Sequence, residues 1–323
     1  MAMAVIGFHA PHEQYPPSEL LDHVLLAEHH GFQAAMCPDH FHPWMPAQGH
    51  SGFAWSWLGA ALHATRLPFG VVNAPGQRYH PAVVAQAAMT LVEMFPGRFW
   101  LGLGSGEALN EHITGEPWPD KATRNERLRQ SAETIRALWR GERVTHDGLV
   151  RVADARLYTR AERPPLILGA ALTEETAEWV GGWADGLLTA GTSVDALEKN
   201  VAAFHRGGGE GKRLVLQAAL SWADTEEAAL ERAWRRWRQA GLAPEQLSDL
   251  STPEAFDAAA AGVRRDDLRE RLQISASLDD HRARLQQIVD LGFDEIYLYQ
   301  VGGDLPRFIE AFGREVLPRL RMI

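Results

Sequence analysis

The sequence predicts an α/β fold, a single (β/α)8 TIM barrel with a helical insertion before the last strand. Short apolar segments alternate with longer segments of helical period along all 323 residues, as in a parallel sheet covered by helices. Eight segments have strand character, and polar residues follow the first four directly. A doubly wound open sheet is the alternative, but "GFHAPHEQYPP" lacks the glycine-rich phosphate turn expected after its first strand. We therefore expect one domain over residues 1–323.

The expected elements follow one another as βα units. The first strand is "AVIGFH", and the helix "ELLDHVLLAEHHG" begins after Ser18, with Leu20 and Val24 on its apolar face. The other seven strands are expected at "FQAAMC", "LPFGVVN", "RFWLGLG", "PPLILGA", "WADGLLTA", "RLVLQAAL" and "DEIYLYQ". Eight such units are enough to close a barrel.

Two segments exceed what a minimal barrel needs. One runs from about residue 142 to 163, and the other, expected to be mainly helical, from about 222 to 280. In the second, Leu230, Trp234 and Trp237 fall on one helical face beside several arginines. This spacing predicts packing against the barrel rather than nucleic-acid binding.

Composition restricts the possible partners. The net charge of −10 and pI near 5.8 disfavour nucleic acid, which is bound through basic surfaces. Cys37 is the only cysteine, the first residues do not read as a signal peptide, and no apolar run is long enough to span a membrane. We expect a cytoplasmic protein, acting as a homodimer on a small-molecule substrate, without membrane or nucleic-acid partners.

Polar residues concentrate after the first four expected strands. His9, His12 and Glu13 follow the first, "PDHFHPW" the second, "NAPGQRYHP" the third and "GSGEALNEH" the fourth. Loops at the carboxyl ends of the strands carry the active sites of (β/α)8 barrels. The first half of the barrel is therefore predicted to hold the site.

The His-x-His spacing in "HFH" raises the alternative of a metal-dependent hydrolase. Such a site needs further ligands from later strands, and "LILGAA", "GLLTAG" and "YLYQ" provide no histidine. We therefore expect no bound metal.

The motifs "DHFHPW" and "GSGEALNE" resemble those of the luciferase-like flavin and deazaflavin oxidoreductases, especially the deazaflavin-dependent glucose-6-phosphate dehydrogenases. The resemblance runs from "GFHAPHEQYPPSELL" to "FIEAFGREVLPRL" and weakens across the two insertions. It implies a barrel enzyme, an oxidoreductase or monooxygenase, that performs hydride transfer or oxygen chemistry at a flavin ring. A non-catalytic flavin-binding barrel is the alternative.

The resemblance also assigns roles to individual residues. His40 and Glu107 match the acid–base pair, Glu13 and Trp44 match residues that line the pocket, and Arg271 matches a substrate-binding cation. Cofactor contacts are implied for Asp39, Val71, Val72, Ala74, Ser105, Gly106, Asn110, Leu172, Thr173 and Thr176. The family often has a non-proline cis peptide bond, expected here between Val71 and Val72.

Departures from the family pattern bear on cofactor and substrate. Ala74 replaces a threonine that contacts the deazaflavin, and a glycine pair is absent near Leu172, although a helix starting near Thr173 could bind a phosphate. These departures favour FMN, with the deazaflavin coenzyme F420 as the alternative. In the related glucose-6-phosphate dehydrogenases two lysines hold the sugar phosphate. Here their places fall near Thr192 or Ser193 and near Asp257, which disfavours glucose 6-phosphate as the substrate.

Overall fold

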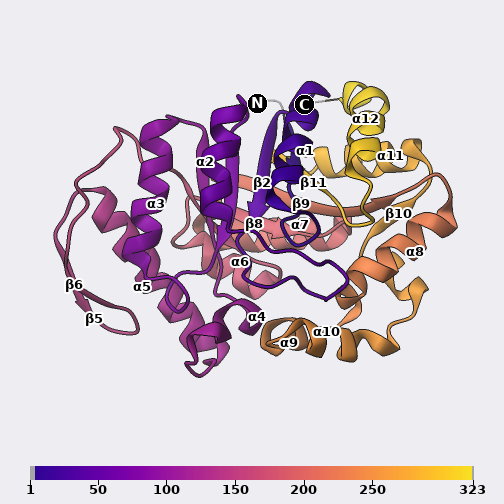
Figure 1. Cartoon of the computed structure of the whole chain (residues 1–323). Helices are drawn as coiled ribbons and strands as arrows, with labels where there is room; N and C mark the ends of the chain where they lie inside the picture. Colours follow the sequence, from indigo (N-terminus) through magenta and orange to yellow (C-terminus); the bar gives the residue numbers. More distant parts are fainter. Residues whose placement is uncertain (1–3, 322–323) are drawn as a thin grey trace.

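The structure, a computed structural model, describes residues 4–321 and contains a closed barrel of eight parallel strands (Figure 1). The strands follow chain order around the barrel, and the last pairs with both the first and β9. They are β1 (Val5–His9), β2 (Ala34–Pro38), β3 (Phe69–Asn73), β4 (Phe99–Leu103), β7 (Ile167–Ala170), β8 (Gly186–Ala190), β9 (Arg213–Trp222) and β11 (Glu295–Gln300). All eight coincide with the expected segments, so the predicted barrel is confirmed.

Helices cover the outside of the barrel. They are α1 (Pro17–His29), α2 (Ala54–Ala64), α3 (Pro81–Met94), α5 (Lys121–Trp139), α6 (Glu174–Gly181), α7 (Val194–Phe204), α11 (Leu278–Val289) and α12 (Leu305–Glu315), with the single turn α4 (Ala108–Glu111) after β4. The predicted helix starts at Glu19, after Ser18, whereas α1 already begins at Pro17. Proline is tolerated at the first position of a helix, because its φ is fixed and its N–H is not needed there. Within residues 4–321, no helix combines the length and apolar character needed to cross a membrane.

Both insertions have structure of their own. Residues 142–163 contain an antiparallel hairpin of β5 (Val144–Asp147) and β6 (Arg151–Ala155), which the sequence did not predict. Residues 222–280 contain α8 (Glu226–Trp237), α9 (Pro244–Asp249), α10 (Pro253–Ala259), four shorter turns or strands η3 (Arg238–Gly241), η4 (Ala260–Gly262), η5 (Arg265–Glu270) and β10 (Gln273–Ser275). The ring of Trp237 contacts Tyr299 at 4.8 Å, and Nε1 of Trp234 donates to the carbonyl of Val263. The predicted packing role of these tryptophans is confirmed.

The barrel interior is filled at the end where the strands begin. Trp100 and Tyr297 are both buried there, and Nε1 of Trp100 donates to Oε2 of Glu295 at 3.1 Å. Arg213 neutralises that carboxylate at 2.7 Å. A Cβ on Gly70 would lie 2.0 Å from the Trp100 ring, so only glycine leaves room for the indole. The opposite end, where the strands finish, is called the mouth below.

Candidate active site

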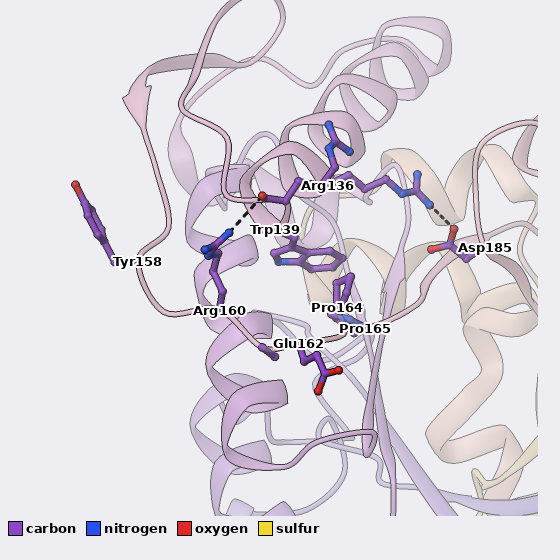
Figure 2. A pocket seen from close by; sticks show the side chains of 10 residues that line it. Arg136, Trp139, Tyr158, Arg160, Glu162, Pro164, Pro165 and Asp185 are labelled. Atoms are coloured by element: carbon purple, nitrogen blue, oxygen red, sulfur yellow. Dashed lines mark hydrogen bonds and ion pairs between the residues drawn. The ribbon is translucent and has the colours of Figure 1, made fainter.

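A cavity of about 800 Å³ lies outside the barrel, far along the strands from the mouth. Figure 2 shows Arg136 bonded to Asp185. Nη1 of Arg160 donates to the backbone carbonyl of Arg140 at 3.4 Å. Pro165 and Asp185 precede β7 and β8, so the cavity lies at the amino-terminal ends of these strands. In barrels of this class that end contributes to stability rather than to chemistry.

His40 stands at the mouth between two carboxylates from different loops. Its Nδ1 lies 3.0 Å from Oε1 of Glu13, which follows β1, and its Nε2 lies 3.7 Å from Oε2 of Glu107, which follows β4. The edge of the His40 ring meets the ring of Trp44 at 5.4 Å. The structure therefore brings together four residues that the sequence singled out separately.

Glu13 and His40 stabilise each other's charged forms. Burial by itself would raise the pKa of Glu13, but the hydrogen bond and charge of His40 reverse this and lower it. Burial would likewise lower the pKa of His40, yet the hydrogen bond and charge of Glu13 together raise it. The pair therefore favours an imidazolium beside a carboxylate.

The surroundings of Glu107, unlike those of Glu13, favour its neutral form. Burial raises the pKa of Glu107, and the nearby charges of Glu111 and Glu13 raise it further, while His40 opposes them. Its side chain is 34% exposed, so it can also reach a molecule bound at the mouth. A carboxyl group with a raised pKa beside an imidazole is suited to acid–base chemistry.

Asn110 connects the loops that carry His40 and Glu107. Its Nδ2 donates to Oε2 of Glu107 at 3.1 Å, while its Oδ1 accepts from the amides of Phe41 and His42 at 2.9 and 3.2 Å. The resemblance implied that this amide contacts the cofactor. In the structure its polar groups hold the loops after β2 and β4 together.

Asp39 lies beneath the mouth with a fully buried side chain. Its Oδ2 accepts hydrogen bonds from Trp55 at 3.0 Å and Asn73 at 2.7 Å, and its Oδ1 accepts one from Tyr79 at 3.3 Å. Arg78 lies 3.7 Å from the same Oδ1. The carboxylate thus contacts protein groups and fixes the start of the His40 loop.

Arg78 and Glu111 belong to the site although the sequence analysis did not single them out. The amide of Arg78 donates to Oε2 of Glu111 at 2.7 Å, and both side chains are almost fully buried. The available signals were weak: Arg78 lies in the polar loop after β3, and Glu111 is four residues after Glu107. Neither signal shows that the two side chains meet.

The β3 and β4 segments correct one expectation. Residues 4–321 contain no cis peptide bond, so the cis bond predicted between Val71 and Val72 is wrong. β3 is instead a regular strand paired with β2 and β4 on its two sides. Val72 faces the barrel interior, whereas the side chain of Val71 packs in the outer core, away from the mouth.

The loop after β4 forms a tight turn beside Ala74. Gly106 has φ +85°, and a Cβ there would lie 3.2 to 3.3 Å from Glu111, Trp118 and Ala74. Both the backbone conformation and this crowding therefore require glycine. Ser105 and Gly106 present a partly exposed backbone next to Glu107.

A second cavity, of about 570 Å³, opens at the ends of β7 and β8. α6 begins here as predicted, with Thr173 as its cap, where Oγ1 accepts from the amide of Thr176 at 3.3 Å. Ser193 starts α7 without using its hydroxyl as a cap. The full lining is Leu172, Thr173, Glu174, Glu175, Ser193, Asp195, Ala196, Lys199 and Asn200.

This second cavity has a mixed polar lining. The amides at the start of α6, the Ser193 hydroxyl and the Lys199 ammonium favour a phosphate. Glu174, Glu175 and Asp195 line the same space and limit how much negative charge it accepts. The predicted Leu172 and Thr173 lie here, in a different part of the mouth from His40.

The two residues considered for substrate binding lie elsewhere. Arg271 follows η5, is exposed, and makes no ion pair with another residue in the described range 4–321. Asp257 is paired with Arg238, which neutralises it. The expected repulsion of a phosphate by Asp257 is therefore weaker than its charge alone suggests.

The second insertion closes one side of the mouth. The ring of Phe256 in α10 meets the ring of Trp44 at 5.3 Å. Phe256 belongs to a buried cluster whose other members are Met45, Leu109, Leu242 and Ala260. Figure 1 shows α9 and α10 beside α4 at this end of the barrel.

The histidines of the "HFH" segment do not face a common point. Nδ1 of His42 lies 2.9 Å from the carbonyl of Leu109, and its ring stacks on His112 at 5.4 Å. In the described part of the chain, no three His, Cys, Asp or Glu side chains converge on a metal-sized point.

A closed barrel whose mouth brings a histidine between two carboxylates, beside a second polar cavity, fits a flavin-type oxidoreductase, in which the cofactor reacts and the protein positions it. Residues 1–295 match the family described as luciferase-like monooxygenase. The chain belongs to this family.

Full-length relatives narrow the class. An F420-dependent glucose-6-phosphate dehydrogenase of Microbacterium testaceum is 36% identical, over 98% of this chain and 97% of its own length. One from Mycobacterium avium is 34% identical over 100% of both chains. The solved structure of an F420-dependent secondary alcohol dehydrogenase, in complex with an F420-acetone adduct, superposes with a TM-score of 0.92 at 28% identity, covering 99% of this chain and 100% of the other.

Proposed function

We propose that this protein is an F420-dependent dehydrogenase that transfers hydride between a small alcohol and the deazaflavin. The observation that carries the proposal is the contact of His40 with Glu13 at 3.0 Å and with Glu107 at 3.7 Å at the mouth of the barrel. The sequence favoured FMN, with F420 as the alternative. F420 now has the stronger support, because full-length relatives at 34 to 36% identity are F420-dependent enzymes.

The residues present fit such a cofactor. Ser105 and Gly106 leave their backbone partly exposed next to Glu107, and in the cavity that also contains Glu174, Glu175 and Asp195, the Ser193 hydroxyl, the Lys199 ammonium and the amides at the start of α6 provide contacts for a phosphate-bearing tail. When bound, the deazaflavin ring supplies a carbon that accepts or releases hydride. Replacement of a threonine by Ala74 removes one hydroxyl contact, and the helix start at Thr173 provides amides in its place.

The protein's own contribution is proton handling. Glu13 binds Nδ1 of His40, so neutral His40 carries its remaining proton there and presents a free Nε2 toward the mouth. That nitrogen is placed to take the proton of a substrate hydroxyl while hydride leaves the carbon that bears this hydroxyl. Glu107 lies on the same side of the ring, and burial raises its pKa, which favours its protonated form.

The substrate proposed is an uncharged alcohol. The chain has only three lysines. Lys121 starts α5, Lys212 donates to the carbonyl of Gly181, and Lys199 lines the second cavity. None therefore stands beside His40, whereas Trp44 backed by Phe256 provides an apolar wall there.

Two measurements test the proposal. Fluorescence titration of the purified protein should give tighter binding of F420 than of FMN. With F420 bound, reduction of the cofactor should follow addition of secondary alcohols such as propan-2-ol more readily than glucose 6-phosphate. Tighter FMN binding would overturn the cofactor choice, and F420 binding without turnover of any alcohol would favour the non-catalytic barrel.

A further inference from the structure

Four carboxylates gather at and beneath the mouth, and the guanidinium of Arg78 lies between two of them. The carboxylates are Glu13, Asp39, Glu107 and Glu111, and the side chain of Arg78 is only 8% exposed. A buried guanidinium is stable only where anionic or carbonyl partners surround it. The partners of Arg78 therefore indicate what it does.

The first partner is Asp39, the residue before His40. Nη2 of Arg78 donates to the backbone carbonyl of Asp39 at 2.5 Å, and Nη1 lies 3.7 Å from its Oδ1. The guanidinium also stacks on the ring of Tyr79 at 4.5 Å, and Tyr79 itself donates to Asp39. This side of the fork fixes the backbone from which His40 projects.

The second partner is Glu111, one helical turn after Glu107. Nε of Arg78 lies 3.4 Å from Oε1 of Glu111, and the Arg78 amide donates to Oε2 at 2.7 Å. Glu111 lies in α4, the turn that begins directly after Glu107. One side chain from the β3 loop thus holds both the β2 loop and the β4 loop.

We propose that Arg78 is a positioning residue of the active site, whose guanidinium fork between Asp39 and Glu111 sets the separation of His40 from Glu107 and places a positive charge near His40. This inference goes beyond the proposed function, because it concerns the protein's own acid–base set whichever flavin is bound.

The charges around His40 determine the direction in which Arg78 shifts its pKa. Glu13 faces it from the β1 loop and Glu107 from the β4 loop, and both favour its protonated form. Arg78, from the β3 loop, opposes protonation and lowers the pKa of His40. Arg78 also lowers the pKa of Glu111, against the larger effect of burial. Asp39 itself is already neutralised by Arg78.

Three variants separate positioning from simple stability. Arg78→Lys keeps the charge but loses the planar fork, and Arg78→Gln loses both. The matched control is Arg124→Gln, since Arg124 is 7% exposed and pairs with Asp249, outside the carboxylate set. If Arg78→Gln does not fold, Arg78→Gln with Glu111→Gln removes the uncompensated buried carboxylate as well.

The readout is the imidazole titration of His40 in histidine-labelled protein without cofactor, with the signal assigned by its loss in His40→Asn. Arg78→Gln, alone or with Glu111→Gln, should move the His40 midpoint to higher pH, and Arg124→Gln should leave it unchanged. Arg78→Lys should retain the midpoint. In the alcohol assay it should lose roughly 10- to 100-fold in kcat with little change in KM, the size expected for small misplacement of reacting groups.

An unchanged His40 midpoint in the Arg78→Gln proteins, or an equal shift in Arg124→Gln, would overturn the inference. Full kcat in Arg78→Lys would refute the positioning part. Because the titration requires neither cofactor nor substrate, it stays informative even if the proposed dehydrogenase activity fails.

Discussion

Glu13 lies 3.0 Å from Nδ1 of His40 and leaves Nε2 toward the mouth, so one ion pair assigns different tasks to the two nitrogens of one ring. Glu13 is 1% exposed and follows β1 on the short segment that also carries His9 and His12. The pairing fixes the orientation of the ring as well as its charge. The predictions below test the consequences of this relationship and of its surroundings.

Replacing His40 by alanine should lower kcat for the alcohol about 10²- to 10⁴-fold, because a general base is lost. The protein should still fold and F420 affinity should change little, although loss of the ion pair with buried Glu13 lowers the unfolding midpoint. Turnover and fluorescence titration measure the two effects, with His63→Ala on the outer face of α2 as the control. Turnover equal to that of the control would exclude His40 from proton transfer.

Replacing Glu13 by glutamine should move the acidic limb of the kcat/KM profile to lower pH. Oxidation requires neutral His40, and Glu13 raises the pKa of His40 in the native protein. Removing that carboxylate lets burial dominate, so His40 deprotonates at lower pH. The control is Glu19→Gln on the exposed start of α1, beside His23. A limb that stays in place would show that another group sets the profile.

Replacing Glu107 by glutamine should reduce turnover but increase thermal stability at pH 8. The folded protein raises the pKa of Glu107, so it binds this proton more tightly than the unfolded chain does, and ionisation costs stability as pH rises through that pKa. Glutamine avoids this cost and still accepts the hydrogen bond from Asn110. Thermal melts at pH 8 and pH 4 should differ between the proteins only at the higher pH. A lower melting temperature at pH 8 contradicts the prediction.

Replacing Phe256 by alanine should raise KM for the alcohol as well as destabilise the fold, by about 3–5 kcal/mol, the usual cost of such a cavity. Phe256 is fully buried and holds the ring of Trp44. Phe204→Ala in α7 is the control, because Phe204 is equally buried and lies against Gly209, far from Trp44. Equal KM values in the two variants would remove the insertion from substrate binding.

The barrel was predictable because each strand is a local apolar run and each loop is contiguous in sequence. The same reasoning located Glu13, His40, Trp44 and Glu107, since the ends of parallel strands meet at one face. The family resemblance then assigned their roles. Each apolar run, each polar loop and each family motif consists of residues that are close together in the sequence.

What could not be predicted depends on side chains that meet across the fold. Arg78 is 39 residues from Asp39 and 33 from Glu111, and no periodicity reports such contacts. The pairing of Asp257 with Arg238 and the packing of Phe256 on Trp44 are of the same kind. The cis bond expected at Val71 came from the family and not from the residues, and β3 is regular there.

The packed lower half of the barrel constrains the order of events. In the described range 4–321, Trp100, Tyr297 and the neutralised Glu295 fill the interior where the strands begin, so access to His40 is from the mouth. Molecules that react beside His40 therefore enter and leave through the mouth. Phe256 of α10 packs on Trp44 at one side of this opening and narrows it. If cofactor and substrate enter by the same opening, the one that lies deeper must bind first and leave last. Steady-state kinetics should therefore follow an ordered sequence, with the product alcohol or ketone released before the cofactor.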